Sequence, residues 1–274
     1  MDFLELLRII FLSIVQGVTE WLPVSSTGHM ILVEHFLEFS HSDEFWSVFL
    51  VVIQLASVMA VVTTFFKQLN PFEFKDGFQT DLKKIRLWFK IAVASLPAAM
   101  IGIPFDDFID THLQSPLIIA TTLIFYGIIF ILVENANKEK TPQISNLDHI
   151  TYKLAFLIGV FQLLALIPGT SRSGATIIGG LLLGMSRKTA AEFTFFLAIP
   201  AMAGGSLIRI LRIGFDFTTA EWMTMIIGCI TAFIVSVITI KFLLGFIKRN
   251  NFKPFAYYRI ILGLIVFAYF FFLN

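Results

Sequence analysis

The chain has 274 residues, of which 57% are hydrophobic and 14% are charged. A soluble domain is about 45–50% apolar and roughly 25% charged, so the composition excludes an ordinary soluble protein and indicates an integral membrane protein. A formal net charge of +1 gives no reason to expect a nucleic-acid partner, and a single cysteine, Cys229, excludes a disulfide framework and a thiolate metal site.

The first apolar segment covers residues 3–22 and is followed by a polar stretch within otherwise apolar sequence. The helix candidate after that stretch reaches only from residue 30 to residue 39. Because about 20 apolar residues are needed to cross a bilayer, this piece is too short to span. Non-helical backbone at membrane depth is tolerated where protein or a water-filled cavity surrounds it. We therefore expect residues 3–39 to form a re-entrant helical hairpin.

Three apolar spans are predicted next, at residues 45–66, 87–104 and 116–133. The loop at 67–90 carries six lysines and arginines, which places it in the cytoplasm by the positive-inside rule. Residues 105–115 contain three aspartates and neither lysine nor arginine, as expected of an outside loop. The polar connector at 134–152 separates two halves, and we place the first repeat at residues 1–140 and the second at 141–274.

The second half has the same plan as the first. A second re-entrant hairpin is expected at residues 152–186, and three spans follow at 190–208, 221–246 and 256–273. An offset of 146 residues places Ser25 on Ser171 and Gln16 on Gln162. Because each half contains an odd number of spans, the halves must cross the membrane in opposite directions, as in proteins built from inverted repeats. The predicted fold is an all-α polytopic membrane protein with about six spans and two re-entrant segments.

The first polar stretch, Pro-Val-Ser-Ser-Thr-Gly-His at residues 23–29, has the side chains of a nucleophilic site. Ionisable groups at membrane depth are costly and usually mark a functional site. Gln16 and Glu20 are four residues apart and share a helical face. Ser26 and His29 are three residues apart, so at a helix start the imidazole can reach the hydroxyl and act as its base. The alternative is a helix cap with one structurally satisfied histidine.

The second polar stretch, Pro-Gly-Thr-Ser-Arg-Ser-Gly at residues 168–174, supplies a cation. The planar guanidinium of Arg172 suits phosphate oxygens, and the amides of a starting helix favour an anion. The alternative is an arginine that extends to the membrane interface. We expect the two loops to form one phosphate-handling site. The expected phosphate-binding residues are Gln16, Ser25, Thr27, Gly28, Gly169, Thr170, Ser171, Ser173 and Gly174.

Both stretches resemble the signatures of the undecaprenyl-diphosphate phosphatase family of the bacitracin-resistance type. The first signature has Glu or Gln, then Glu four residues later, then the seven residues found here at 23–29, and it matches Gln16 and Glu20. The second signature matches residues 168–174, and the resemblance spans essentially the whole chain. Many members carry Glu where this chain has Gln16, and a glutamine cannot act as a base or bring a charge to a metal.

This resemblance implies a function, a location and a cofactor. The enzyme would remove the terminal phosphate of a C55 isoprenyl diphosphate, which recycles the lipid carrier of bacterial cell-wall synthesis and confers bacitracin resistance. It would be a multi-pass protein of the bacterial inner (plasma) membrane, with inverted repeats and an active site toward the outer face. A divalent cation, Mg²⁺ or Ca²⁺, is associated with the family. The expected partners are the polyprenyl diphosphate and the bilayer, and a homodimer is left open.

The residues and the resemblance together predict a mechanism. Ser26 would attack the terminal phosphorus, His29 would take its proton, and Arg172 would hold the phosphoryl oxygens. Glu20 would bind the cation or orient His29, and the sequence leaves both roles open. The alternative function is a polyprenyl-phosphate transporter that uses the same anion site. The acid-phosphatase-like lipid phosphatases are rejected because they need a histidine downstream of their Ser-Arg element, and no histidine follows His149.

Overall fold

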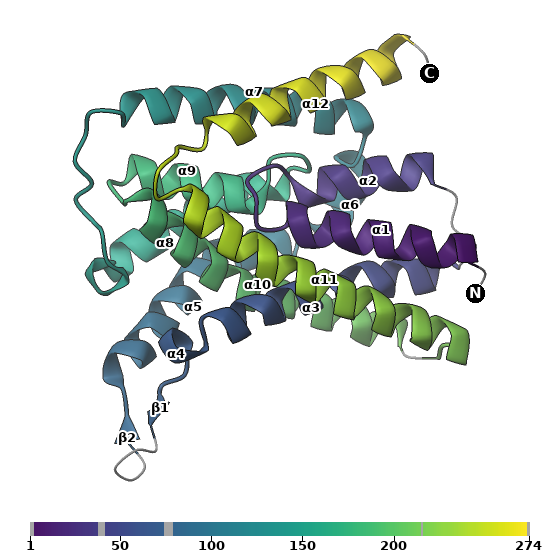
Figure 1. Cartoon of the computed structure of the whole chain (residues 1–274), viewed down its shortest axis with the longest axis horizontal. Helices are drawn as coiled ribbons and strands as arrows, with labels where there is room; N and C mark the ends of the chain where they lie inside the picture. Colours follow the sequence, from purple (N-terminus) through teal and green to yellow (C-terminus); the bar gives the residue numbers. More distant parts are fainter. Residues whose placement is uncertain (1–2, 38–41, 74–78, 215, 273–274) are drawn as a thin grey trace.

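The computed structural model describes residues 3–37, 42–73, 79–214 and 216–272, which are mostly helical (Figure 1). The first half contains α1 (Phe3–Thr19), α2 (Ser26–Phe36), α3 (Asp43–Thr64), α4 (Phe66–Leu69), β1 (Phe72–Glu73), β2 (Gln79–Thr80), α5 (Leu82–Gly102), α6 (Asp106–His112) and α7 (Pro116–Ala136). The second half contains η1 (Leu147–His149), α8 (Tyr152–Gln162), η2 (Leu163–Leu166), α9 (Arg172–Leu182), α10 (Arg187–Ile213), α11 (Thr219–Phe246) and α12 (Lys253–Phe272). The strands β1 and β2 form an antiparallel hairpin.

Six helices in the described ranges are long and apolar enough to cross a membrane, namely α3, α5, α7, α10, α11 and α12. They coincide with the six predicted spans, so the all-α class and the polytopic character are confirmed. Among the six spans, α5 has the start that differs most from the prediction: it begins at Leu82 rather than near residue 87. The Asp81 side chain accepts hydrogen bonds from the amides of Lys83 and Lys84 and caps the helix there.

Two further differences from the sequence-based expectation concern residues 105–115 and the end of α1. Residues 105–115, expected to be a loop, contain the short helix α6, which has Asp106 and Asp107 in its first turn and His112 in its last. Acids at the start and a basic group at the end of a helix complement its dipole. The helix α1 ends at Thr19 rather than near residue 22, because the chain turns between there and the start of α2.

The helices pack in pairs that join the two halves. The helix α12 lies along α7, α10 along α3, and α11 along both α1 and α3, while α5 packs on α8 (Figure 1). The pair α7 and α12 is closely packed. A Cβ atom at Gly127 would lie 3.0 Å from the carbonyl oxygen of Ala256, and one at Gly263 would lie 2.8 Å from that of Ala120. Small residues allow such close approach between helices in membranes.

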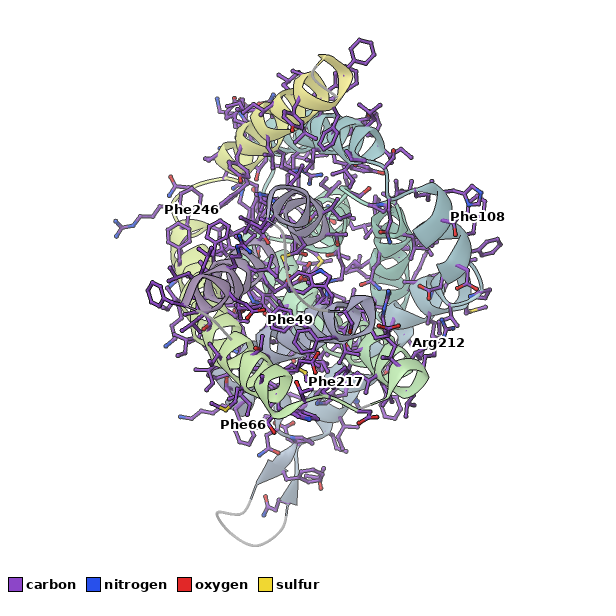
Figure 2. All side chains as sticks on the ribbon, turned by 90° about the vertical axis from the view of Figure 1, so that its right-hand side faces the viewer. Phe49, Phe66, Phe108, Arg212, Phe217 and Phe246 are labelled. Carbon is purple, nitrogen blue, oxygen red and sulfur yellow. The ribbon has the colours of Figure 1, made fainter. Side chains whose placement is uncertain are left out.

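The outer surface of the bundle is apolar. Phe49 is buried inside, whereas Phe66 and Phe108 lie exposed on the outside (Figure 2). Four isoleucines spaced four residues apart make one exposed face of α11: Ile226, Ile230, Ile234 and Ile238. Residues with this spacing share a helical face, so the surface is suited to lipid tails rather than to water.

The close contact of α7 with α12 gives a test of the packing. Gly263→Ala should lower the free energy of unfolding by about 1–3 kcal/mol, because the added methyl group meets backbone and the helices must separate. Gly245→Ala on α11 is the matched control, because a Cβ atom there meets nothing within 4 Å. Thermal unfolding in detergent measures both variants, and equal melting temperatures would contradict the proposed close contact.

Candidate active site

The two polar loops end in helix starts with the same local structure. Ser25 precedes α2 with φ 73°, and Ser171 precedes α9 with φ 74°. Each serine hydroxyl accepts the amide hydrogen of the residue three positions later, Gly28 at 3.3 Å and Gly174 at 3.1 Å. Within the described ranges these serines are the non-glycine residues with positive φ. Such backbone costs about 1–3 kcal/mol and is typical of functional sites.

The Glu20 carboxylate lies where the two loops meet. It is 3% exposed and follows the last turn of α1. Its Oε2 atom accepts hydrogen bonds from the Ser26 hydroxyl at 2.8 Å and from Gln16 Nε2 at 3.1 Å. Its Oε1 atom accepts one from Arg172 at 3.2 Å. Ser26 and Arg172, which are 146 residues apart in the chain, therefore bind the same carboxylate. The predicted association of the two loops in one place is confirmed.

Arg172 is held on both sides and leaves one polar atom unpaired. One terminal nitrogen of its guanidinium donates to Glu20, and the other donates to the Thr194 carbonyl of α10 at 3.1 Å. In the described part of the chain, Arg172 Nε and the Thr170 hydroxyl are buried without a hydrogen-bond partner. Buried polar groups are normally paired, so these two atoms are suited to hold the oxygens of a bound anion.

The expected contact between Ser26 and His29 is absent from the hydrogen bonds that the described residues make. His29 Nδ1 lies 2.7 Å from the Ser25 carbonyl, and Nε2 lies 2.7 Å from the Tyr258 hydroxyl. A carbonyl can only accept, so Nδ1 carries the hydrogen and a neutral ring accepts from Tyr258 through Nε2. Ser26 is the first residue of α2, and its side chain turns back to Glu20. The side chain that accepts the hydrogen bond of the Ser26 hydroxyl is therefore Glu20.

The remaining predicted binding residues in the two loops differ in their contacts and exposure. The Ser173 hydroxyl donates to the Leu22 carbonyl and also contacts the Ser171 hydroxyl. Gly169 has φ 86° and lies against α7, where Thr122 donates to the neighbouring Pro168 carbonyl. Thr27 is exposed in the first turn of α2. Side-chain contacts between the loops thus join the two motifs at several points.

Comparison with known proteins identifies the family. Residues 9–265 match the family described as "Bacitracin resistance protein BacA". The chain is 56% identical over 268 residues to an undecaprenyl-diphosphatase of Enterococcus faecalis, with 97% of each chain covered. It is 57% identical over 270 residues to an undecaprenyl-diphosphatase of Lachnoclostridium phytofermentans, with 98% of each covered. The chain belongs to the BacA family. The resemblance carried by the two motifs is thereby confirmed.

Two residues of this BacA-family site lie outside both motifs. Tyr258 and Arg259 are neighbours on α12, and they reach His29 and the backbone of both loops. Neither residue was predicted from the sequence. An arginine inside an apolar helix is itself an indication of function, so Arg259 could have been found by that criterion. Tyr258 has no comparable indication in the sequence.

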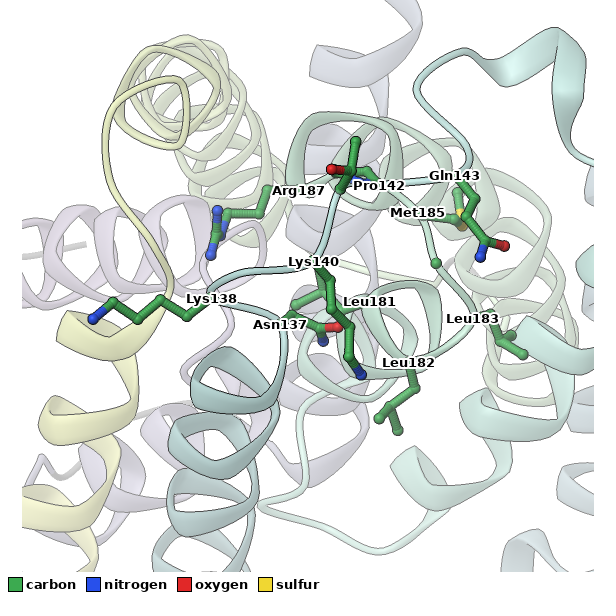
Figure 3. Close-up of a pocket in the computed structure, with 12 residues that line it drawn as sticks. Asn137, Lys138, Lys140, Pro142, Gln143, Leu181, Leu182, Leu183, Met185 and Arg187 are labelled. Atoms are coloured by element: carbon green, nitrogen blue, oxygen red, sulfur yellow. The ribbon is translucent and has the colours of Figure 1, made fainter.

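A cavity of about 640 Å³ lies at the other end of α9 and is separate from this site (Figure 3). The end of α7, the connector after it, and the turn between α9 and α10 line the cavity. Lys138, Lys140 and Arg187 are among its lining residues, and no residue of either motif is. The cavity therefore plays no part in the geometry described above.

The contact between His29 and Tyr258 gives a second test. Tyr258→Phe keeps the stacked ring, whose centroid is 5.6 Å from that of His29, but removes the hydroxyl that donates to Nε2. The loss should be about 1 kcal/mol of stability, with a change in the imidazole ¹⁵N chemical shifts of His29. Tyr257→Phe is the matched control on the same turn. If both variants leave the imidazole shifts unchanged, the assigned hydrogen bond is wrong.

Proposed function

We infer that this protein is an undecaprenyl-diphosphatase, which hydrolyses undecaprenyl diphosphate to undecaprenyl phosphate and inorganic phosphate. Relatives that are 56% and 57% identical over nearly their whole length carry that activity in their names. The monophosphate returns to cell-wall synthesis as lipid carrier, and the activity confers bacitracin resistance. The observation that supports a role for this site is the Ser26 hydroxyl, which donates to the buried carboxylate that also binds Arg172.

Ser26 acts as the nucleophile and Glu20 as its base. As the Ser26 oxygen bonds to the terminal phosphorus, its proton passes to Glu20 Oε2, 2.8 Å away, and the bond from phosphorus to the bridging oxygen breaks. Undecaprenyl phosphate leaves, and the phosphoryl group stays on Ser26. Water then attacks that phosphorus, Glu20 returns a proton to the serine oxygen, and inorganic phosphate is released. A carboxylate within hydrogen-bond reach of the hydroxyl satisfies the geometry required of a general base.

Positive charge and free amides stabilise the charge that develops on the phosphoryl oxygens. Arg172 supplies a guanidinium with an unpaired Nε, and Thr170, two residues earlier, supplies an unpaired hydroxyl. The starts of α2 and α9 add backbone amides and the positive ends of two helix dipoles. Donors fixed before the reaction are worth more than solvent donors, because they do not have to reorient. His29 has a structural role here, because its imidazole holds the Ser25 carbonyl by a hydrogen bond.

A divalent cation fits the donor set through oxygen atoms. Mg²⁺ is usually bound by one or two carboxylates together with substrate phosphates, and Glu20 is the carboxylate of this site. Gln16, whose Nε2 already donates to Glu20, can offer its amide oxygen. When bound, Mg²⁺ or Ca²⁺ would neutralise the diphosphate. The described residues contain no group of three or more metal-binding side chains, so substrate oxygens would have to complete the coordination.

The arrangement of the helices supports two inverted repeats with re-entrant hairpins. The helices α2 and α9 have 11 residues each, or about 16 Å of helix, and the hydrocarbon core is about 30 Å thick. The hairpin α1–α2 lies to the right in Figure 1 and α8–α9 to the left, so their loops meet in the interior. The packing of the two hairpins also corresponds, because α11 packs along α1 in the first hairpin and α5 packs along α8 in the second.

The charge distribution supports a plasma-membrane orientation with the substrate entering from the outer face. The loop that contains β1 and β2 is flanked by Lys67, Lys83 and Lys84, which favours the cytoplasm. The start of α3 is then outside, and the α1–α2 hairpin enters from that side. Ser26 at the start of α2 lies about 16 Å inside this hairpin, within reach of a lipid diphosphate that enters from the outer leaflet.

Replacement of the nucleophile is the direct test. Ser26→Ala should lower phosphate release from undecaprenyl diphosphate in detergent at least about 1,000-fold, because the variant lacks the hydroxyl that forms the covalent intermediate. Ser25→Ala removes a capping hydroxyl instead and should act mainly on stability. Phosphate release and mass spectrometry of the trapped phosphoenzyme measure the two effects. Retained activity in Ser26→Ala with loss in Ser25→Ala would assign the nucleophile to the other hydroxyl.

The identity of the base can be tested separately. Glu20→Gln keeps a group of the same shape but cannot take a proton, so kcat should fall by about 100–10,000-fold. His29→Gln should lower kcat less than 10-fold on the same scale, because His29 binds Ser25 and Tyr258 rather than Ser26. Steady-state kinetics of both purified variants decide the matter. A larger loss in His29→Gln than in Glu20→Gln would restore the histidine as base.

A further inference from the structure

Arg259 lies in α12, outside both motifs, and is completely buried at 0% exposure. Its guanidinium donates to the Pro23 carbonyl at 3.3 Å and to the carbonyls of Gly169 and Thr170 at 2.9 and 2.8 Å. The first acceptor belongs to the first loop, and the other two belong to the second. One side chain from the last helix of the chain therefore holds the backbone of both loops.

The hydrogen bonds of Arg259 go to backbone carbonyls and not to a carboxylate. A buried charge is expensive unless it is well bonded, and an apolar side chain of similar volume would often serve packing equally well. A lysine could not replace this geometry either, since its ammonium is a point charge whereas the guanidinium is a rigid fork. The forked guanidinium of Arg259 is therefore suited to bind carbonyl oxygens at separate positions, such as those of two different loops.

The three carbonyls lie one or two residues before the strained helix caps. Pro23 is two residues before Ser25, and Thr170 is the residue before Ser171, the two serines with positive φ. In a trans peptide the carbonyl and the following amide point in opposite directions. By holding the Thr170 carbonyl, Arg259 directs the Ser171 amide away from itself. Strained backbone persists only where its surroundings fix it, and Arg259 provides such a constraint for both loops.

The guanidinium also contacts the first turn of α9. A Cβ atom at Gly174 would lie 2.9 Å from an Arg259 terminal nitrogen, so the glycine leaves the space that the arginine occupies. Arg172 belongs to the same turn and binds Glu20. A displaced Arg259 would thus move α9, and with it Arg172, relative to the carboxylate that Ser26 uses.

We propose that Arg259 is the positioning residue that holds the two loops in register, so that Ser26 and Arg172 meet at Glu20. It makes no contact with the reacting atoms in this proposal and acts through the backbone of the loops. The catalytic consequence rests on the proposed function of the site. The structural consequence, a coupling between loops 146 residues apart, does not depend on that function.

Two variants and one control test the coupling. Arg259→Lys keeps the charge and loses the fork, and Gly174→Ala keeps the arginine but crowds it. Arg187→Lys is the matched control, because its guanidinium also makes a two-point contact, to Glu134, beside the distant cavity. Hydrogen–deuterium exchange is measured on peptides that cover residues 23–28 and 169–174, together with kcat, KM and the melting temperature of each full-length protein in detergent.

Arg259→Lys should speed amide exchange in both loops and lower kcat about 10–100-fold, the effect expected of misplaced catalytic groups, with KM changed less than kcat. Gly174→Ala should speed exchange in the first loop, although the substitution lies in the second. Arg187→Lys should leave both loops and kcat unchanged. Wild-type exchange of the first loop in both variants would overturn the proposal, as would loosening of the second loop alone. A wild-type protein that releases no phosphate would overturn the proposed function, while the exchange data would still decide the coupling.

Discussion

The Glu20 carboxylate is removed from water and shared by groups from both halves of the chain. It is 3% exposed and accepts hydrogen bonds from Gln16, Ser26 and Arg172. A buried carboxylate without partners is too costly to persist in its charged form. The charge therefore constrains the fold, because the loop that carries Arg172 must come to the loop that carries Ser26. The same arrangement brings a hydroxyl, a base and a cation together, which is what phosphoryl transfer requires.

The backbone carbonyls of the two loops around this carboxylate also need hydrogen-bond donors. Both loops are irregular, and buried backbone carbonyls outside regular helices need hydrogen-bond partners from elsewhere in the protein. Side chains supply donors to the exposed carbonyls: Thr122 to Pro168, Ser173 to Leu22, and Arg259 to Pro23, Gly169 and Thr170. The chain thus places polar side chains in apolar helices at positions where they can donate hydrogen bonds to the carbonyls of a loop. The polar residues of α7 and α12 that contact the loops follow from this need.

The sequence predicted the fold well because hydropathy and length decide it. An apolar run of about 20 residues has few alternatives to a spanning helix, and all six spans were found. The short helices α2 and α9 were also expected, as segments too short to cross a bilayer. The association of the loops was predicted from the offset of 146 residues, and the shared caps at Ser25 and Ser171 explain why that offset was visible. The helix α6 was not predicted because it has only 7 residues and its three aspartates are equally typical of a loop.

Contacts distant in sequence limited the prediction of the site. The spacing of Ser26 and His29 suggested a pair, but spacing along a helix does not say which third group lies nearer. Glu20 precedes α2 and accepts the hydrogen bond of the Ser26 hydroxyl. The hydroxyl of Tyr258, which lies 229 residues after His29, binds the His29 imidazole. No local pattern in the sequence contains the contact with Tyr258. The three acceptors of Arg259 are also distant along the chain, at separations of 236, 90 and 89 residues.

The neutral residue at position 16 fits this electrostatic arrangement. Gln16 Nε2 donates to the same Glu20 oxygen that accepts from Ser26. A glutamate there would place a second carboxylate against that oxygen, and two adjacent carboxylates require a shared proton or a cation between them. The side-chain amide hydrogen of Gln16 occupies that position, so neither a shared proton nor a cation is needed there. Glu20 Oε2 therefore accepts hydrogen bonds from both Gln16 and Ser26 with no second carboxylate at position 16.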